Sequence, residues 1–379
     1  MSQDPTATSD VAVIGGGVIG LAIAWRAAQR GLSACVLERG ELGAGASRVA
    51  AGMLAPVTEA DAGELALLEL GLRSARAWPR FADELADAAG SGPGLRCSGA
   101  LVVARDRDEA EALERELALR RELGLDVERL LPSAARRLEP ALAPTVRLAL
   151  DVAGDHSADP RALVLALAEA ARRAGVTLRT GAAVARVEHG GGRVRGVRLA
   201  SGGVVRAARV VVAAGAWSGV IDGLPAIPLR PVKGQILRLR DPAGPGLLER
   251  TVRFEGGYLV PRGDGRYVLG ATIEERGFDT TVTAGGLYEL LRDAGELVPG
   301  VHELVVEETS AGLRPATPDN APLLGRSEEL AGLHWATGHH RNGILLAPVS
   351  AEIVVDGLQD DAAQAPAAFA AARFHRVRA

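Results

Sequence analysis

The sequence predicts an α/β protein in which a domain with a mainly parallel sheet is joined to a second, β-rich α+β domain. Two observations indicate the first domain. Residues 10–38 follow the order strand, glycine-rich turn, helix, strand, and residues 210–213 form a fully apolar strand that re-enters a parallel sheet. Alternating strands over residues 228–239 and 258–270 indicate the second domain. A chain of 379 residues, 47% of them apolar, is long enough for both.

The first unit is a strand over residues 11–14 and a helix over residues 18–30, joined by a turn that carries Gly15, Gly17 and Gly20 as G-x-G-x-x-G. In a Rossmann-like unit the first glycine permits the tight turn and the second lets a pyrophosphate approach the backbone. The third allows the helix to pack closely on the strand. The phosphates are expected at the helix N-terminus, where free N–H groups and the helix dipole favour anions.

Glu38 ends the second predicted strand, residues 32–37, and lies eighteen residues after Gly20. A carboxylate at this position can accept hydrogen bonds from both ribose hydroxyls of an adenosine. It argues for FAD or NAD and against NADP, whose 2′-phosphate would meet a like charge. The alternative is a glycine-rich turn in another kind of βαβ unit, and the combination of strand, helix, second strand and Glu38 favours the dinucleotide site.

The composition limits the classes of partner. The formal net charge is −4 and the charged residues are dispersed, so the sequence predicts a small-molecule partner and neither nucleic acid nor a membrane. Cys35 and Cys97 match no metal spacing and no redox pair, and Cys35 is expected as a buried, inert thiol. Residues 1–9 lack the apolar stretch of a secretory signal, and no apolar run reaches the about 20 residues of a membrane span. We therefore expect a cytoplasmic protein without a metal.

The remaining elements are predicted in chain order. Residues 40–56 are small enough to lie against a flat ligand, and Ser47 is expected to cap a short helix over residues 48–52. A helix over residues 64–89 is expected to break near Pro79. The other helices are predicted over residues 107–123, 132–140, 159–174, 286–294 and up to 358, and the other strands over residues 100–104, 176–179, 184–188, 194–199, 204–206 and 333–336.

Eight segments carry a resemblance to a known family. After the N-terminal βαβ unit, the chain contains GAGASRVAAGMLAP, AAGAWS, PVKGQ, YLVPR, GAT, AGLRP and GHHRNGILLAP in that order. This series resembles the D-amino acid oxidase-like flavoenzymes over residues 11–358. The segments AAGML and HRNGILLAP are most similar to the members that oxidise glycine for thiamine biosynthesis.

The resemblance implies a non-covalent FAD in an extended pose. The discontinuous FAD-binding domain would comprise residues 9–85, 145–220 and 315–365, the substrate-binding domain residues 86–144 and 221–314, and the tails residues 1–8 and 366–379. The implied cofactor contacts are Gly15, Gly17, Val18, Ile19, Gly20, Glu38, Arg39, Ser47, Ala50, Ala51, Gly52, Met53, Val184, Ala213, Gly215, Trp217, His340, Arg341, Asn342, Gly343, Ile344 and Leu345.

The resemblance also implies substrate contacts. A guanidinium holds a carboxylate in a fixed plane with two parallel hydrogen bonds, and Arg314 in AGLRP matches the carboxylate-binding arginine of the family, the alternative being a surface arginine. Arg341 supports either the carboxylate or only its own loop. Tyr258 in YLVPR matches a tyrosine near the carboxylate, the alternative being a structural strand residue. His339 and His340 need no general-base role in a hydride mechanism.

The implied reaction is oxidative deamination of glycine, and of sarcosine or small D-amino acids, by hydride transfer to flavin N5, with molecular oxygen as acceptor. The imine would hydrolyse or pass to a thiazole synthase, and a homo-oligomer, a tetramer in many members, is expected. Gly256, Gly257 and Ile273 depart from the glycine-oxidising members and would widen the pocket. Three alternatives stay open: a D-amino acid or sarcosine oxidase or dehydrogenase, a non-catalytic FAD-binding redox protein, and an NAD-dependent dehydrogenase.

Overall fold

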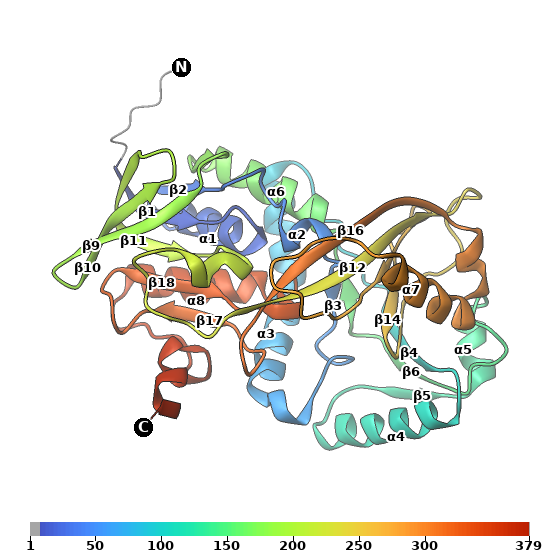
Figure 1. Cartoon of the computed structure of the whole chain (residues 1–379). Coiled ribbons are helices and arrows are strands. Elements are labelled where there is room, and N and C mark those ends of the chain that lie inside the picture. The colour runs from blue at the N-terminus through green and yellow to red at the C-terminus, as the bar shows by residue number, and fades with distance from the viewer. Residues whose placement is uncertain (1–7, 379) are drawn as a thin grey trace.

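The computed structural model describes residues 8–378 and contains two eight-stranded sheets, one in each half of an elongated molecule (Figure 1). The predicted α/β fold class is confirmed. Of the predicted N-terminal tail, residues 1–7 lie outside the described part, and Thr8 already belongs to the first strand. None of the helices between residues 8 and 378 has the length and apolar composition that a membrane span needs.

The elements have the following bounds. The helices are α1 (Val18–Gln29), α2 (Ala46–Val49), α3 (Leu65–Ala89), α4 (Arg107–Glu122), α5 (Pro132–Leu138), α6 (Pro160–Arg173), α7 (Ala284–Leu297) and α8 (Ala347–Gln359). The first sheet contains β1 (Thr8–Ile14), β2 (Ala34–Leu37), β8 (Thr177–Arg179), β9 (Val184–Gly190), β10 (Arg193–Leu199), β11 (Val204–Val212), β17 (Leu323–Arg326) and β18 (Leu333–Thr337). The second contains β4 (Ala100–Ala104), β5 (Glu128–Leu130), β6 (Leu148–Val152), β12 (Arg230–Arg240), β13 (Thr251–Phe254), β14 (Gly257–Pro261), β15 (Arg266–Gly270) and β16 (Val305–Ala316). β3 (Met53–Leu54) pairs separately with β7 (His156–Ser157).

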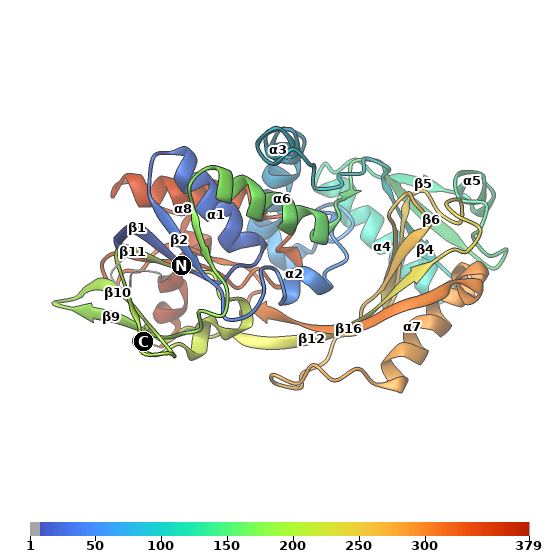
Figure 2. The same ribbon diagram turned by 90° about the horizontal axis from the view of Figure 1, so that it is seen from above.

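The first sheet has the strand order β17-β18-β11-β1-β2-β8, and its central strands run parallel. Helices α1, α6 and α8 lie together on one face (Figure 2), and residues of β9 and β10 pack against the other, so the central strands are apolar on both sides. The carboxyl ends of β1, β2 and β11 meet at one edge of the sheet. That edge is where a doubly wound sheet binds its ligand.

Three local predictions were wrong. The strands predicted over 204–206 and 210–213 are one strand, β11, because its backbone pairs with β1 without a break from residue 206 onward. Helix α3 continues through Pro79, where Phe81 packs edge-on against Trp78 and Trp25 at ring distances of 5.4 and 5.8 Å. Burial of these rings holds the helix together on both sides of the proline.

The third error concerns Ser47. It lies inside α2, which begins after Gly45 without a side-chain cap, so Ser47 is not the N-cap of a helix over residues 48–52. Helix α6, by contrast, begins as predicted, because the Asp159 carboxylate accepts from the N–H groups of Arg161 and Ala162.

The second sheet has the order β16-β12-β15-β14-β13-β4-β6-β5. Its longest pair, β12 and β16, is antiparallel from Arg230 opposite Ala316 to Arg240 opposite Val305, and it reaches toward the first sheet in both views (Figures 1 and 2). β6 pairs with β4 and β5, so residues 148–152 lie in this sheet although the predicted boundary assigns them to the FAD-binding domain. We propose moving that boundary to about residue 153. At the C-terminus, Phe369 of the predicted tail is buried in the core of the first half.

Candidate active site

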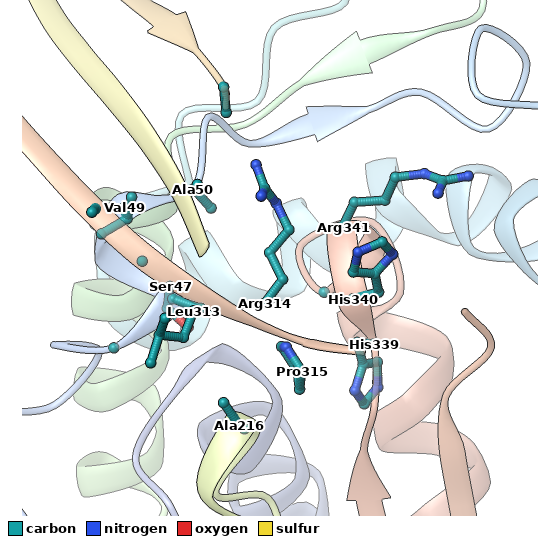
Figure 3. Close-up of a pocket in the computed structure, with 18 of the residues that line it drawn as sticks. Ser47, Val49, Ala50, Ala216, Leu313, Arg314, Pro315, His339, His340 and Arg341 are labelled. Carbon is teal, nitrogen blue, oxygen red and sulfur yellow. The ribbon is translucent and has the colours of Figure 1, made fainter. Parts of the chain in front are cut away.

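A cavity of about 1540 Å³ extends from the glycine turn of the first sheet to β12, β14 and β16 of the second (Figure 3). It exceeds the about 300–1,000 Å³ typical of small-molecule pockets, so it has room for a dinucleotide and a second ligand. The sequence-predicted residues that line it are Gly15, Gly17, Val18, Ile19, Glu38, Arg39, Ser47, Ala50, Ala51, Gly52, Met53, Val184, Ala213, Gly215, Trp217, Tyr258, Arg314, His339, His340, Arg341, Asn342, Gly343 and Ile344.

Gly20 and Leu345 are the two predicted contacts that do not line the cavity. A Cβ atom at Gly20 would lie 2.0 Å from the Gly15 carbonyl oxygen, so this glycine serves the packing of α1 on the turn. The Leu345 carbonyl accepts hydrogen bonds from Ser74 and Trp78 of α3. Leu345 therefore ties the loop before α8 to the core.

The glycine turn is built for close backbone approach. Gly15 has φ +108°, and a Cβ atom on it would lie 2.4 Å from the Ala213 carbonyl oxygen at the end of β11. Helix α1 starts after Gly17 with neither a capping bond from that residue nor an acidic residue in its first turn. An anion at this helix N-terminus would therefore meet N–H groups and no acidic side chain from the first turn of the helix itself.

Glu38 and Ser47 hold the turn from two sides. The Glu38 carboxylate accepts from the Gly16 N–H at 2.7 Å and from the Gly40 N–H at 2.9 Å. The Ser47 hydroxyl oxygen accepts from the Val18 N–H at 3.0 Å. The carboxylate thus fixes the two βα turns relative to each other, and its remaining lone pairs are available to ribose hydroxyls.

A cluster of flat side chains covers another part of the cavity wall. The Arg39 guanidinium lies 3.6 Å from the centroid of the Trp217 ring, and Phe278 packs on the same ring at 5.6 Å. All three residues line the cavity, as does Val184 at the start of β9. The sequence analysis predicted Trp217 and Val184 as cofactor contacts but not Phe278, which lies in the second half of the chain.

Arg314 points from β16 into the cavity (Figure 3). Its Nη1 donates to the carbonyl oxygens of Lys233 at 3.2 Å and Thr272 at 3.1 Å. Within residues 8–378 no carboxylate pairs with this guanidinium. A Cβ atom at Gly234, on the neighbouring strand β12, would lie 2.4 Å from Nη1 and Nη2. The guanidinium can therefore occupy this position because residue 234 is a glycine.

Tyr258 lies in β14, on the wall of the same part of the cavity. Burial raises the pKa of the Tyr258 hydroxyl, although the nearby Arg314 guanidinium lowers it, so the tyrosine is neutral at physiological pH. Gly257 also serves packing, since a Cβ atom there would lie 2.8 Å from the Gly270 carbonyl oxygen. Gly256 has φ +85°, and Ile273 is 80% exposed at the rim.

Arg341 differs from Arg314 because it is fully paired. Its Nε donates to Glu59 at 2.9 Å and its Nη2 to Glu64 at 2.8 Å. Figure 3 shows its guanidinium directed away from that of Arg314. Of the two interpretations of Arg341, these contacts favour the one in which it supports its own loop.

The two histidines of that loop are neutral. Burial lowers the pKa of His339 to about 3, and its Nε2 lies 2.9 Å from the Ser350 hydroxyl. Burial and the neighbouring arginines lower the pKa of His340 to about 3, and its Nδ1 is buried without a partner. Bases this weak are unsuited to proton abstraction near pH 7, which agrees with the hypothesis that neither is a general base.

Several site residues were missed by sequence reasoning. The cavity is also lined by Glu59, Arg253, Gly234, Gln235, Phe278 and Glu289. Glu59 follows a loop whose backbone is held at Val57 and Thr58 by the buried Asp155 carboxylate. Arg120 of α4 donates to the carbonyls of the same two residues, so this helix is attached to the loop that leads to the cavity. The motif PVKGQ was the available signal for Gly234 and Gln235.

A glycine turn at a helix N-terminus, a ribose-type carboxylate and a cavity that continues to a guanidinium without a carboxylate partner in the described residues are the features of a dinucleotide-dependent oxidoreductase. Comparisons with known proteins specify the class further. The model of the family described as FAD dependent oxidoreductase matches residues 10–357. The chain belongs to this family, and FAD is its cofactor.

Among its relatives, the glycine oxidase of Geobacillus kaustophilus is 37% identical over 353 residues, which is 92% of each chain. The bifunctional protein ThiO/ThiG of Trichormus variabilis is 38% identical over 359 residues, 92% of this chain and 52% of that protein. The crystal structure of glycine oxidase from Geobacillus kaustophilus superposes with a TM-score of 0.90 at 35% identity and covers 97% of this chain and 99% of that one.

Proposed function

We propose that this protein is an oxidase of glycine and of other small amino acids. The observation that carries the proposal is Arg314, a guanidinium that lines the cavity with two hydrogen bonds to backbone carbonyls and no carboxylate partner among residues 8–378. A half-buried guanidinium that lines a cavity is free to pair with a ligand, and a substrate carboxylate would do so bidentately. The glycine oxidases among its relatives support the same substrate class.

In this proposal the chain positions the reactants. When bound, FAD accepts the hydride from the substrate Cα. Arg314 holds the carboxylate, the neutral Tyr258 hydroxyl donates to it, and the N–H groups at the start of α1 hold the cofactor pyrophosphate. Glu38 holds the adenosine ribose. No side chain is assigned a proton transfer from Cα.

The overall reaction moves two electrons and two protons from the amine to dioxygen, which gives the imino acid and hydrogen peroxide. Water then hydrolyses the imine of glycine to glyoxylate and ammonia. We also propose a thiazole synthase as the acceptor of the imine, because a relative of nearly twice the length is a ThiO/ThiG protein. From the family resemblance we also propose that the protein is cytoplasmic and forms a homo-oligomer.

A second candidate is a sarcosine or D-amino acid oxidase or dehydrogenase. It is favoured by Gly256 and Gly257, which line the cavity without side chains beside Tyr258. A substituent on the amine or on Cα would find room at this wall. The two candidates differ in substrate and in electron acceptor, so one experiment separates them.

The experiment mixes the purified, FAD-loaded protein anaerobically with glycine, sarcosine, D-alanine or D-proline, follows the loss of visible flavin absorbance, and then admits air. Rapid bleaching by glycine followed by hydrogen peroxide is the expected result. Bleaching only by the larger substrates, or reoxidation only by an added dye, would replace the proposal by the second candidate. Absence of bleaching by all four amino acids would contradict both.

The role of Arg314 is tested by Arg314→Ala, with the exposed Arg276→Ala as the matched control. We expect Arg314→Ala to retain FAD and to raise the KM for glycine by about 100-fold, because the charge-assisted pair with the substrate carboxylate is lost. Arg276→Ala should leave KM unchanged. Steady-state oxygen uptake measures both, and near-normal kinetics of Arg314→Ala would remove this residue from the site.

A further inference from the structure

The segment that connects β15 to α7, residues 271–283, is named here the strap. It lies beside β12 and contributes Thr272, Ile273, Glu274 and Phe278 to the lining of the cavity. An isolated β-bridge joins its backbone to β12, since the Lys233 N–H donates to the Glu274 carbonyl at 2.8 Å and the Glu274 N–H donates to the Lys233 carbonyl at 3.0 Å. The strap is therefore attached to the strand that underlies Arg314.

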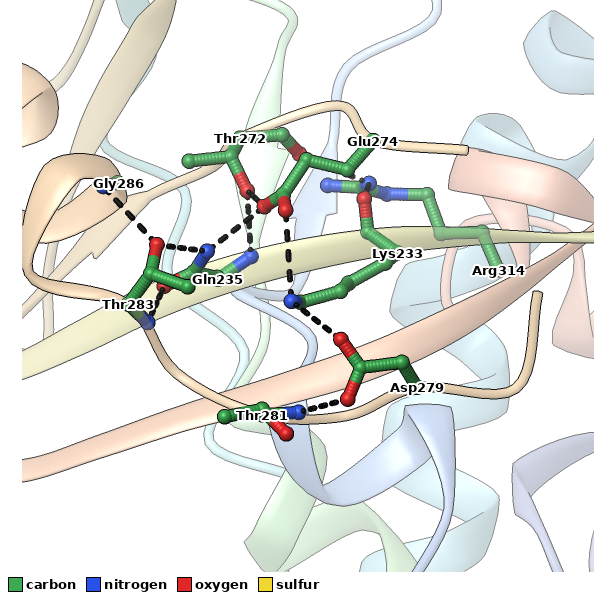
Figure 4. A network of polar contacts seen from close by, with 9 residues as sticks. All are labelled: Lys233, Gln235, Thr272, Glu274, Asp279, Thr281, Thr283, Gly286 and Arg314. Carbon is green, nitrogen blue, oxygen red and sulfur yellow. Dashed lines mark hydrogen bonds and ion pairs between the residues drawn. The ribbon is translucent and has the colours of Figure 1, made fainter. Parts of the chain in front are cut away.

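The side chain of Lys233 is almost completely buried, with 1% of its surface exposed. Its ammonium group pairs with Glu274 at 3.3 Å and with Asp279 at 3.2 Å, both on the strap (Figure 4). Burial of a lysine costs free energy unless the charge is paired. The two carboxylates offset that cost and connect the strap to β12 a second time.

Glu274 is the centre of the remaining contacts in Figure 4. Its Oε1 accepts from the Thr272 hydroxyl at 2.6 Å and from the Gln235 amide at 2.8 Å. Gln235 in turn donates to Thr283 at 3.1 Å, at the far end of the strap. Burial would raise the pKa of Glu274, but the hydrogen bonds from Thr272, Gln235 and Lys233 outweigh it and lower the pKa, so the group is ionised at neutral pH.

The residues in these contacts include the two whose carbonyl oxygens accept hydrogen bonds from Arg314. The carbonyl oxygens that orient its Nη1 are those of Lys233 and Thr272. In the described part of the chain, Tyr258 is the one further polar partner of this side chain. Glu274 binds both residues: its N–H donates to the Lys233 carbonyl, and its carboxylate accepts from the Lys233 and Thr272 side chains. The Glu274 main chain thus holds the Lys233 carbonyl directly, and its carboxylate holds the side chains of the two residues that carry both acceptors of the guanidinium.

We propose that Glu274 is a positioning residue for Arg314, which holds the Lys233 and Thr272 carbonyls so that the free edge of the guanidinium faces the substrate carboxylate. The inference rests on the proposed function of Arg314. It assigns Glu274 no contact with the reacting atoms. It also explains a charge arrangement, because Glu274 and Asp279 pair with Lys233 and not with Arg314.

The test compares Glu274→Ala and Glu274→Gln with Glu275→Gln as the matched control, an exposed neighbour that pairs only at the surface with Arg230. Two quantities are measured in the FAD-loaded protein: the KM for glycine and the Kd of acetate from its perturbation of the flavin spectrum. We expect both to rise by about tenfold in Glu274→Ala with kcat changed less than twofold, since orientation of one charge-assisted contact is lost.

Glutamine retains the Oε1 acceptor of Thr272 and Gln235 but loses the charge and the Oε2 acceptor of Lys233. Glu274→Gln should therefore recover part of the affinity, with increases of about threefold. Glu275→Gln should match the unmodified protein. FAD content and the thermal unfolding midpoint of each variant report on the fold. Should Glu274→Ala fail to fold, Glu274→Gln still decides, because unchanged KM and Kd in that variant would overturn the proposal.

A double-mutant cycle separates this inference from the proposed function. If Glu274 acts through Arg314, adding Glu274→Ala to Arg314→Ala should raise the acetate Kd no further. Additive effects would overturn the positioning role. If Arg314→Ala itself leaves acetate binding unchanged, the proposed function fails first. A large effect of Arg314→Ala combined with identical results for Glu274→Ala and Glu275→Gln would overturn only the role of Glu274.

Discussion

At the residue scale, Glu38 shows what position in a motif can and cannot predict. Its place at the end of β2 predicted a carboxylate near a ribose, because the geometry of a βαβ unit is repeated from protein to protein. The spacing between the glycines and Glu38 does not predict its second contact, in which the carboxylate accepts from the Gly16 N–H at 2.7 Å, in the turn after β1. The carboxylate therefore contributes to the shape of the glycine turn as well as to the ligand site.

This double role gives a prediction for Glu38→Ala. The substitution removes the ribose acceptor and the bond to Gly16, so we expect the Kd for FAD to rise by at least about tenfold, while kcat of the FAD-saturated protein changes little. Flavin fluorescence during titration of the apoprotein measures the affinity. Glu41→Ala, which removes an exposed carboxylate three residues later, is the control, and equal FAD affinity in the two variants would contradict the assignment.

Arg314 and Arg341 were both predicted as cations near the substrate, and their surroundings differ. Both belong to recognisable motifs, and nothing in those motifs distinguishes a free guanidinium from a paired one. The difference is made by Glu59 and Glu64, which precede Arg341 by more than 270 residues and are brought to it by the fold. Pairing of charges across the chain is a tertiary property, and a single sequence does not report it.

At the element scale, prediction succeeded where the signal is local and failed where neighbours decide. The start of α6 follows from Asp159 and Pro160 alone. The continuity of α3 through Pro79 does not, because it depends on Trp25 of α1 and on the Leu345 carbonyl that accepts from Trp78. The strap was unassigned for the same reason, because Glu274 and Asp279 attach it to Lys233 of β12.

The strap also has an aromatic contact that should affect cofactor retention. Phe278 packs on Trp217, the ring that carries Arg39, and all three line the cavity near the first sheet. We expect Phe278→Ala to speed the release of FAD by about five- to tenfold, because an aromatic pair contributes about 0.5–1.5 kcal/mol beyond its buried area. Dialysis followed by absorbance measures the loss. Tyr288→Ala, which removes an exposed aromatic ring of α7, should not change it, and a Phe278→Ala protein that retains FAD equally well would contradict the role.

At the scale of the whole molecule, the fold class and the family could be predicted because ordered motifs run along almost the entire chain. The joint between the two halves could not. It is formed by β12 and β16, whose register places Gly234 opposite Gly312 and leaves space for the Arg314 side chain. Strand register arises from pairing between segments 80 residues apart, which no local pattern contains.

The free energy of unfolding of the whole molecule should depend on pH, because burial shifts the pKa of several titratable groups in the folded protein. Burial lowers the pKa of His334 to about 4 and those of His339 and His340 to about 3. Between these values and the unfolded value of 6.5, the unfolded chain binds more protons than the folded one, so stability falls as pH falls below 6.5. Burial raises the pKa of Asp155 to about 6 and raises that of Glu139, and these two groups act in the opposite direction.

The three histidines outnumber the two acids, so the free energy of unfolding should increase between pH 5 and pH 6.5. The expected slope is at least that of one group, about 1.4 kcal/mol per pH unit. Urea unfolding of the FAD-saturated protein at several pH values measures it.

His334 does not line the cavity, and its Nε2 lies 3.1 Å from the Gly357 carbonyl. Replacement of His334 by glutamine removes one titrating group, so the slope should decrease by about 1.4 kcal/mol per pH unit, whereas His189→Gln at an exposed position should not reduce it by this amount. A slope that is unchanged in His334→Gln would show that this histidine is already accessible to protons in the folded protein, and the burial of β18 against α8 would then have to be loose enough to admit water.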